Sequence, residues 1–326
     1  MKVKIVSPWS ERWLQAHLTL GDVEFTRDED CTDYDWLVVY DEIPRRIKHI
    51  DLQCPASHTI LVTQEPAIIK THAPCYINQF NYILTTHNPD VCRHRNYRRG
   101  VGCLTWLNGH SFEELAACPE FPKSDVVSAV CSRKTMKKTE HYKRHTMFEY
   151  LLEHLPEFSW KGQGIDPIDY KYQALDTFKY HIAIENCNQP YHWTEKIADA
   201  IMSLCLPFYS GDPTLEQVLP ADSFIRIPND DPPKALAIIK KAIADNEYEK
   251  RLPALKEARK LLVERYNLYQ QIISVIQEHE QKHPQKEEDT GSSRIYERHY
   301  MRRNLFNLIG EGIDLLRIKL FCNLKG

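Results

Sequence analysis

Short apolar runs with little alternation recur between residues 3 and 227, and they constrain the fold more than any other feature. They are rich in Val, Ile and Tyr, and polar residues separate them. A strand with one face in water alternates between apolar and polar residues, whereas a strand covered on both faces is apolar throughout. The pattern therefore predicts buried strands in parallel sheets. The runs are Val3–Val6, Trp36–Tyr40, Thr59–Thr63, Tyr82–Thr85, Val126–Val130, Tyr180–Ile184, Pro207–Tyr209 and Phe224–Ile227.

Helical patterns lie between the later runs. Tyr142–Leu155 and Glu195–Leu204 both carry apolar residues at the spacing of one helix face. Alternation of strands and helices predicts a doubly wound α/β fold. From Pro232 to His279 the chain is expected to be mostly helical, with Pro253 starting a second helix.

The composition is that of a soluble globular protein and weighs against several other classes. The chain has 326 residues, 42% of them hydrophobic and 27% charged, which is enough for two domains of ordinary size. A net charge of -3 argues against a general nucleic-acid binder. The 10 cysteines are scattered without a CxxC pair, no apolar stretch is long enough to span a bilayer, and the N-terminus turns polar too soon for a signal peptide. We therefore expect a cytoplasmic location.

Two polar segments mark the expected domain boundaries. Ala117–Asp125 contains two prolines and precedes a new strand, and Gln281–Ser293 has the composition of a flexible hinge. The segment from Arg294 to Gly326 is basic and partly amphipathic. It could dock on an anionic membrane as a surface helix, or it could pack back across the two domains. The expected domains are therefore 1–122, 123–282 and 283–326, of which the last is a hinge followed by a helical tail.

A strand, a polar loop and a helix follow one another between Tyr180 and Leu204. Thr194 is the expected N-cap, since its hydroxyl can accept from a free N–H of the first helical turn. Glu195 and Lys196 then lie in that turn, at the carboxyl end of a strand, where α/β sheets bind phosphate groups. A carboxylate beside an ammonium suits a nucleotide, because one accepts from ribose hydroxyls and the other neutralises a diphosphate. The alternative is a capped helix with a solvated first turn.

Three neighbouring motifs extend this pattern. They are Phe178-Lys-Tyr-His-Ile-Ala-Ile-Glu-Asn-Cys187, Thr194-Glu-Lys-Ile-Ala-Asp-Ala200 and Leu206-Pro-Phe-Tyr-Ser-Gly-Asp-Pro213. In their order and spacing they resemble the donor-binding signature of the α-1,3/4-fucosyltransferase family, glycosyltransferase family 10, in its bacterial form. The resemblance implies a GT-B fold of two Rossmann-like, doubly wound domains that face a cleft, with the acceptor bound by the first domain and a nucleotide sugar by the second. It also implies an enzyme that transfers fucose from GDP-fucose to a sugar hydroxyl with inversion.

Matching positions imply the roles of individual residues. Asn186 would contact the donor phosphate or sugar, Glu195 the ribose or fucose hydroxyls, and Lys196 the diphosphate. Arg144, early in the first helix of the donor domain, would neutralise the leaving GDP without a metal ion. The remaining donor-binding candidates are Glu185, His192, Ser132, Lys134, Tyr209 and Gly211. His192 and Trp193 depart from the family pattern, which leaves another nucleotide sugar as an alternative donor.

Glu65 is the expected general base. The strand Thr59–Thr63 runs into a Glu-Pro turn, and the family has a Glu at a comparable strand end of its acceptor domain. Inverting displacement needs a carboxylate that takes the proton from the attacking hydroxyl. The alternatives are that Glu65 is a surface carboxylate at a turn, or that Glu185 is the base.

Two charged loops are further candidate sites. Asp28–Asp35 contains acidic pairs of the type that hold a divalent cation, but it precedes a strand instead of following one, which favours a solvated loop. No metal ion or other cofactor is therefore expected to be essential. Arg93–Arg99 could steer an anionic acceptor, although an exposed loop is the simpler interpretation.

The expected function is α-1,3-linked transfer of fucose to an acceptor glycan, in the synthesis of surface polysaccharide or lipopolysaccharide. The alternatives are the same fold with another nucleotide sugar, or a catalytically silent glycan-binding relative. The expected partners are the donor and the acceptor glycan, with no nucleic acid. The basic tail would add a peripheral contact with the inner face of an anionic membrane.

Overall fold

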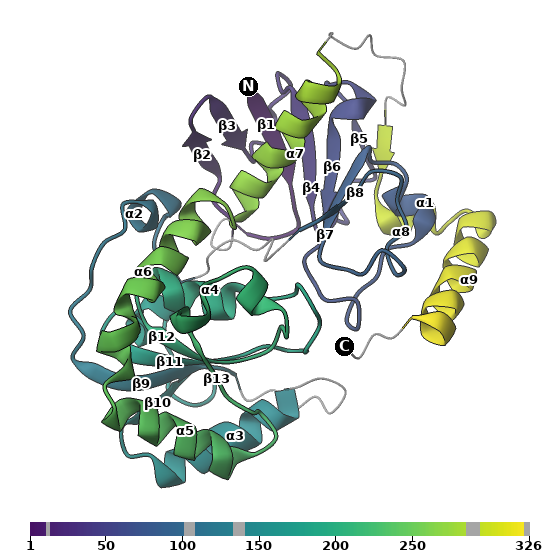
Figure 1. Cartoon of the computed structure of the whole chain (residues 1–326). Coiled ribbons are helices and arrows are strands. Elements are labelled where there is room, and N and C mark those ends of the chain that lie inside the picture. Colours follow the sequence, from purple (N-terminus) through teal and green to yellow (C-terminus); the bar gives the residue numbers. More distant parts are fainter. Residues whose placement is uncertain (11–13, 101–107, 133–140, 285–293, 323–326) are drawn as a thin grey trace. The chain divides into compact units, whose positions relative to one another are not determined.

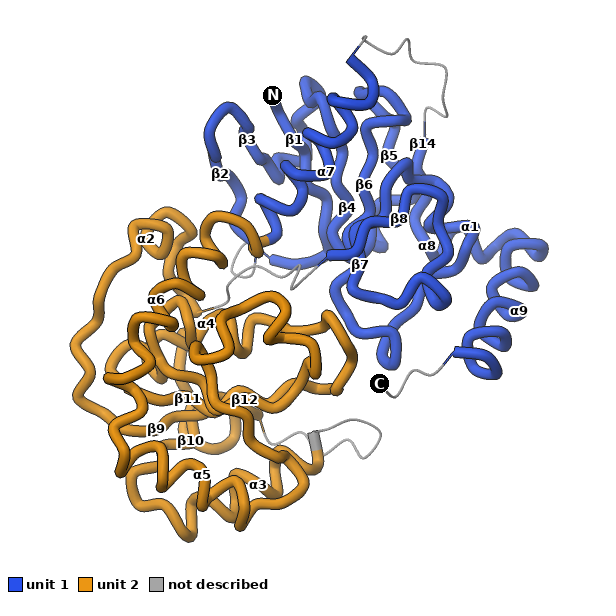
Figure 2. The backbone as a smooth tube through the Cα atoms, in the orientation of Figure 1, with its two compact units in different colours: residues 1–103, 268–326 blue, residues 104–267 orange. Residues whose placement is uncertain are grey.

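The computed structural model describes residues 1–10, 14–100, 108–132, 141–284 and 294–322. The chain divides into two compact units (Figure 2). Unit 1 comprises residues 1–103 and 268–326, and unit 2 comprises residues 104–267. Each unit has its own central sheet (Figure 1).

Unit 1 is built on a seven-stranded sheet in the order β2-β3-β1-β4-β6-β7-β8. Neighbouring strands are parallel except for the antiparallel pair β2–β3. Every residue of β4, β6 and β7 is buried, as the continuous apolar runs predicted. The strands are β1 (Lys2–Val6), β2 (His17–Leu20), β3 (Val23–Thr26), β4 (Trp36–Tyr40), β6 (Thr59–Val62), β7 (Tyr82–Thr85) and β8 (Tyr97–Arg99).

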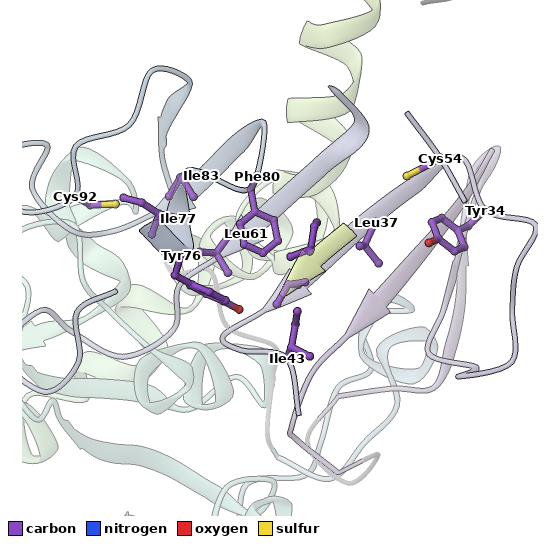
Figure 3. Packing of buried hydrophobic residues seen from close by; sticks show 12 residues of the cluster. Tyr34, Leu37, Ile43, Cys54, Leu61, Tyr76, Ile77, Phe80, Ile83 and Cys92 are labelled. Atoms are coloured by element: carbon purple, nitrogen blue, oxygen red, sulfur yellow. The ribbon is translucent and has the colours of Figure 1, made fainter. Parts of the chain in front are cut away.

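Helices and a two-stranded sheet complete unit 1. The strand β14 (Arg294–Tyr296) pairs antiparallel with β5 (His49–Asp51), so the C-terminal segment returns to this unit. Leu61 and Ile83 from the central sheet pack with Tyr76 and Phe80 (Figure 3), and Ile295 of β14 joins the same core. The helices are α1 (Pro74–Ile77), α7 (Leu268–Lys282), α8 (Arg298–Met301), α9 (Leu305–Phe321) and the 3₁₀ helix η1 (Ala56–His58).

Unit 2 is built on a fully parallel five-stranded sheet in the order β10-β9-β11-β12-β13. In chain order this is 2-1-3-4-5, so the topological switch point, where open α/β sheets bind ligands, lies between β9 and β11. The strands are β9 (Asp125–Val130), β10 (Phe158–Lys161), β11 (Phe178–Ile184), β12 (Leu206–Ser210) and β13 (Ile225–Arg226). The α-helices are α2 (Phe112–Ala116), α3 (His141–His154), α4 (Glu195–Met202), α5 (Pro232–Ala244) and α6 (Glu247–Glu264), and the 3₁₀ helices are η2 (Lys171–Ala174), η3 (Leu215–Gln217) and η4 (Ala221–Ser223).

The predicted fold class, two doubly wound α/β units with parallel sheets, is confirmed. The cleft between two facing domains stays a prediction. The prediction that a helix starts at Pro253 was wrong, because Pro253 lies inside α6. The break before α6 comes instead at Asn246, whose left-handed φ of 52° ends the preceding helix. A proline inside a helix removes one N–H donor and crowds the carbonyl of the preceding turn, yet α6 continues past Pro253.

The unit boundaries also differ from the predicted ones, because α7 packs on the sheet of unit 1. Nδ1 of His279 lies 2.9 Å from the hydroxyl of Tyr82 on β7. Glu278 accepts two hydrogen bonds from Arg98 on β8, at 2.7 and 2.8 Å. A helical periodicity does not reveal which sheet a helix covers, so the sequence assigned α7 to the preceding domain.

Candidate functional site

The carboxyl ends of β9 and β11 lie side by side in unit 2, and α4 begins close to them. Thr194 is the N-cap of α4, as predicted, and its hydroxyl accepts from the backbone N–H of Lys196 at 3.3 Å. The loop that joins β11 to α4 therefore places Glu195 and Lys196 at the switch point of the sheet.

The side chain of Glu185 connects the two ends of this loop by hydrogen bonds. It directly follows β11, is 1% exposed, and accepts from the backbone N–H of Thr194 at 2.8 Å and from its hydroxyl at 2.7 Å. Nζ of Lys196 lies 3.4 Å from the same carboxylate. Burial raises the pKa of Glu185, and Lys196 opposes this rise. These two hydrogen bonds join residues nine positions apart in the sequence, and they fix the start of α4 relative to the end of β11.

Gly211 makes this arrangement of Glu185 sterically feasible. A Cβ at position 211 would meet Cγ of Glu185 at 2.5 Å and the hydroxyl of Tyr209 at 2.5 Å. Tyr209 itself is completely buried in β12, and its hydroxyl accepts from the backbone N–H of Asp212 at 2.9 Å. The structure thus gives Gly211 and Tyr209 supporting positions behind Glu185.

Glu195 and Lys196 form an ion pair at the start of α4, with Nζ 3.2 Å from Oε1. Burial would raise the pKa of Glu195, but the ammonium groups of Lys196 and Lys171 outweigh it and lower the pKa to about 2. Burial would lower the pKa of Lys196, but Glu195 and Glu185 outweigh it and raise the pKa. Glu195 and Lys196 are therefore both charged at neutral pH.

Arg144 reaches the same strand end from α3. Its Nη1 donates to the backbone oxygen of Ile184 at 3.1 Å and to Oδ1 of Asn186 at 3.2 Å. The side chain is 7% exposed, and its Nε has no hydrogen-bond partner among the described residues. Within that part of the chain, the partners of Arg144 are neutral oxygens. Arg144 and Lys196 also line one narrow cavity of about 10 Å³, together with Val130 and Ile184 at the two strand ends.

Sequence reasoning missed two charged residues of this cluster. Nζ of Lys171, on η2, lies 2.9 Å from Oδ2 of Asp199 and 3.7 Å from Oε1 of Glu195. Lys171 lies in no recognisable motif. Asp199 could have been predicted to have a cationic partner, because it is a carboxylate on the buried, otherwise apolar face of α4.

The remaining donor-binding candidates lie at different depths. Ser132 is half-buried and follows β9 closely, near the switch point. His192 is 4% exposed within the β11–α4 loop, and its backbone N–H donates to the oxygen of Gln189 at 3.2 Å. Lys134 lies outside the described residues.

Glu65 belongs to unit 1, where it follows β6 as predicted. The residue is half-buried, and its backbone oxygen lies 2.9 Å from Nε2 of His87, beyond the end of β7. His87 is buried, and burial lowers the pKa of its imidazole. The strand-end position of Glu65 is thus observed, and its role as a base stays a prediction.

The acidic loop 28–35 and the basic loop 93–99 were the two further candidate sites. Among the described residues, no group of three or more His, Cys, Asp or Glu side chains is placed to hold a metal ion. The acidic residues 28–35 precede β4, and Asp33 pairs with Lys2 at 2.7 Å. In the basic segment, Tyr97–Arg99 forms the edge strand β8, and Arg98 is engaged by Glu278. Metal independence stays a prediction.

Part of unit 2 matches the sequence model of a known protein family. Residues 121–251 match the sequence model described as glycosyltransferase family 10 (fucosyltransferase), C-terminal. The chain is therefore similar to this family over that segment, as its motifs predicted, and it is a glycosyltransferase.

Solved structures resemble the chain at low identity. A crystal structure of an α1,3-fucosyltransferase with GDP-fucose has a TM-score of 0.45 and 17% identity, over 77% of this chain and 80% of that chain. A second α1,3-fucosyltransferase structure has a TM-score of 0.45 and 15% identity, over 82% and 91%. The trehalose-6-phosphate synthase OtsA has a TM-score of 0.47 and 10% identity, over 77% and 73%.

Proposed function

We propose that the protein transfers fucose from GDP-fucose to a hydroxyl of an acceptor glycan, with inversion at the anomeric carbon. The observation that carries the proposal is the cluster at the switch point of unit 2, where Arg144, Glu195 and Lys196 meet at the ends of two parallel strands. Cations suit a diphosphate, and an ionised carboxylate suits the vicinal hydroxyls of a sugar. The cluster belongs to the segment that matches the family.

Each residue of the cluster has a proposed role toward the donor. The guanidinium of Arg144 faces the diphosphate and stabilises the negative charge that develops as GDP leaves. Glu195 accepts hydrogen bonds from ribose or fucose hydroxyls. Lys196 keeps Glu195 ionised and adds positive charge, and Asn186 contacts the phosphate or the sugar.

Glu65 is the proposed general base. It takes the proton from an acceptor hydroxyl, whose oxygen attacks the anomeric carbon as the bond to the diphosphate breaks. The electron pair of that bond leaves with GDP, so the step requires no redox partner. The family suggests an α-1,3 linkage in a surface polysaccharide or lipopolysaccharide.

Turnover with defined donors tests this proposal. The full chain is incubated with GDP-fucose and a panel of oligosaccharide acceptors, and products are detected by mass spectrometry. The expected result is a product heavier by one fucosyl residue, formed from GDP-fucose and from no UDP or CMP sugar. Transfer from a different nucleotide sugar would show another donor. Donor binding without transfer or hydrolysis would show a catalytically silent relative.

We further propose that α9 carries the membrane contact expected of the tail. Its outward residues are almost all apolar, and Phe306 and Phe321 are 84% and 82% exposed. The polar face of α9 turns toward unit 1, where Glu311 binds Arg302 at 2.6 Å. No helix in the described part of the chain combines the length and apolarity needed to cross a bilayer. The exposed apolar residues are Leu305, Phe306, Leu308, Ile309, Ile313, Leu315, Leu316, Leu320 and Phe321.

The arrangement favours shallow insertion over attraction to anionic headgroups, because several tail arginines are paired with carboxylates. Sedimentation with neutral and anionic phospholipid vesicles tests this mode of binding. The wild-type chain should sediment with both, with little effect of salt, and Ile313→Glu/Leu316→Glu should remain in solution. Equal sedimentation of the variant would exclude α9 as the contact.

A further inference from the structure

Lys171 connects two carboxylates of unit 2 that lie four residues apart on α4. Its Nζ is 2.9 Å from Oδ2 of Asp199 and 3.7 Å from Oε1 of Glu195. The side chain of Asp199 is 1% exposed, while those of Lys171 and Glu195 are 23% and 16% exposed. Lys171 therefore joins the buried carboxylate of Asp199 to the partly exposed carboxylate of Glu195 in the first turn of α4.

The position of Lys171 is fixed by its own segment. The next residue, Tyr172, donates its backbone N–H to the oxygen of Asn108 at 2.7 Å. Oε1 of Gln173 accepts from the backbone N–H of Tyr170 at 3.1 Å, which closes a capping box around η2. A lysine on an ordered turn holds its ammonium group in one place with a smaller loss of conformational entropy on binding.

Both lysines of the cluster approach the same oxygen of Glu195. Lys196 lies 3.2 Å from Oε1 and Lys171 lies 3.7 Å from Oε1. Two cations that pair with one oxygen of a carboxylate restrict its orientation. Its second oxygen remains able to accept hydrogen bonds.

We propose that Lys171 is a positioning residue for the donor sugar nucleotide: it holds Oε1 of Glu195 so that Oε2 accepts from a pair of ligand hydroxyls. This inference rests on the proposed function, in which Glu195 binds the ribose or fucose of GDP-fucose. Asp199 anchors Lys171 on its buried side.

Two substitutions that break the same ion pair separate positioning from stability. Lys171→Met removes the ammonium from both carboxylates, whereas Asp199→Asn leaves Lys171 beside Glu195. Both should lower the melting temperature, because Lys171→Met leaves the buried carboxylate of Asp199 without its counter-ion and Asp199→Asn removes the nearer of the two carboxylates that pair with Lys171. Lys179→Met is the matched control, since Lys179 pairs with Glu249 on a solvated surface, with side chains 37% and 49% exposed.

The measurement is the Kd of GDP-fucose by titration calorimetry, well below the melting temperature of each variant. Lys171→Met should raise Kd about tenfold or more, the loss expected for hydrogen bonds to a charged group. Asp199→Asn and Lys179→Met should change it less than about threefold, a difference well under 1 kcal/mol. Unchanged binding by Lys171→Met would overturn the inference, as would an equal loss in Asp199→Asn, since the pair would then act through stability alone. If the wild-type chain does not bind GDP-fucose, the proposed function falls and this inference falls with it.

Discussion

At the scale of single residues, the balance of charge distinguishes Arg144 from Lys196 in the proposed donor site. Lys196 lies 3.4 Å from Glu185 and 3.2 Å from Glu195, so carboxylates inside the protein balance its charge. The partners of Arg144 in the described part of the chain are neutral oxygens. A buried cation without a counter-ion is unfavourable, and a bound phosphate would supply one. We therefore assign the diphosphate chiefly to Arg144, with Lys196 ordering the carboxylates.

Gly211→Ala tests the support behind Glu185. The added methyl group would meet Cγ of Glu185 and the hydroxyl of Tyr209, both at 2.5 Å, and neither is the end of a flexible surface chain. Overpacking of this kind costs about 1–3 kcal/mol, and it should also displace Glu185 and weaken donor binding. Chemical denaturation measures the first effect and calorimetry the second.

Gly310→Ala is the control for this substitution, since nothing lies within 4 Å of a Cβ at that position on α9. It should leave stability unchanged or raise it by up to about 1 kcal/mol through helix propensity. If Gly211→Ala had the stability and the donor affinity of the wild type, position 211 would not be tightly packed against Glu185 and Tyr209.

Glu65→Gln tests the base. The amide keeps the shape of the side chain but cannot take a proton, so kcat should fall by about 10²–10⁴-fold while the Kd of GDP-fucose stays unchanged. Glu257→Gln, on the exposed face of α6, is the control and should keep full turnover. Retention of wild-type kcat in Glu65→Gln would show that another group accepts the proton.

At the scale of elements, the apolar runs located the central strands well because burial on both faces leaves a plain signal. β4 and β7 have the predicted bounds, and the N-cap of α4 follows from Thr194. The hairpin of β2 and β3 was missed, since short strands at a sheet edge need few apolar residues. The tail was predicted as basic, but the sequence could not show which carboxylates of unit 1 its arginines meet.

Glu42 links α8 to the N-terminal part of unit 1 and makes this contact sensitive to pH. Its carboxylate lies 2.9 Å from Nζ of Lys70 and 2.8 Å from Arg298 on α8. Burial would raise the pKa of Glu42, but hydrogen bonds from Arg298 and Lys70 outweigh it and lower the pKa from 4.5 to about 2. A carboxyl group whose pKa is lower in the folded than in the unfolded protein stabilises the fold at every pH above its unfolded pKa. This stabilisation is lost as the pH falls from about 4.5 toward 2.

Glu42→Gln should therefore destabilise the protein by about 1–3 kcal/mol at neutral pH. It should also flatten the fall of the melting temperature between about pH 4.5 and pH 2, because the titrating group is gone. Melting curves of both proteins across this range measure the difference. Parallel pH profiles for wild type and variant would mean that the ionisation of Glu42 is not linked to stability.

At the scale of the whole molecule, the sequence was most informative about unit 2. The motifs around Asn186, Glu195 and Lys196 lie within 40 residues of one another, and strand ends place them together. Lys171 was not predicted because it lies in no motif and meets Glu195 and Asp199 only through tertiary contacts. In unit 1, a single carboxylate at a strand end had no neighbouring motif, so Glu65 rests on position and family resemblance.

The central claim is that unit 2 binds GDP-fucose, and the melting temperature of the full chain in the presence of nucleotide sugars tests it most directly. A ligand that binds the native state at 100 times its Kd stabilises it by about 2.7 kcal/mol, which is readily seen as a thermal shift. The account predicts stabilisation that rises with the concentration of GDP-fucose, a shift with GDP, and none with UDP or CMP sugars. Stabilisation by a UDP or CMP sugar, or no shift with GDP-fucose, would contradict it.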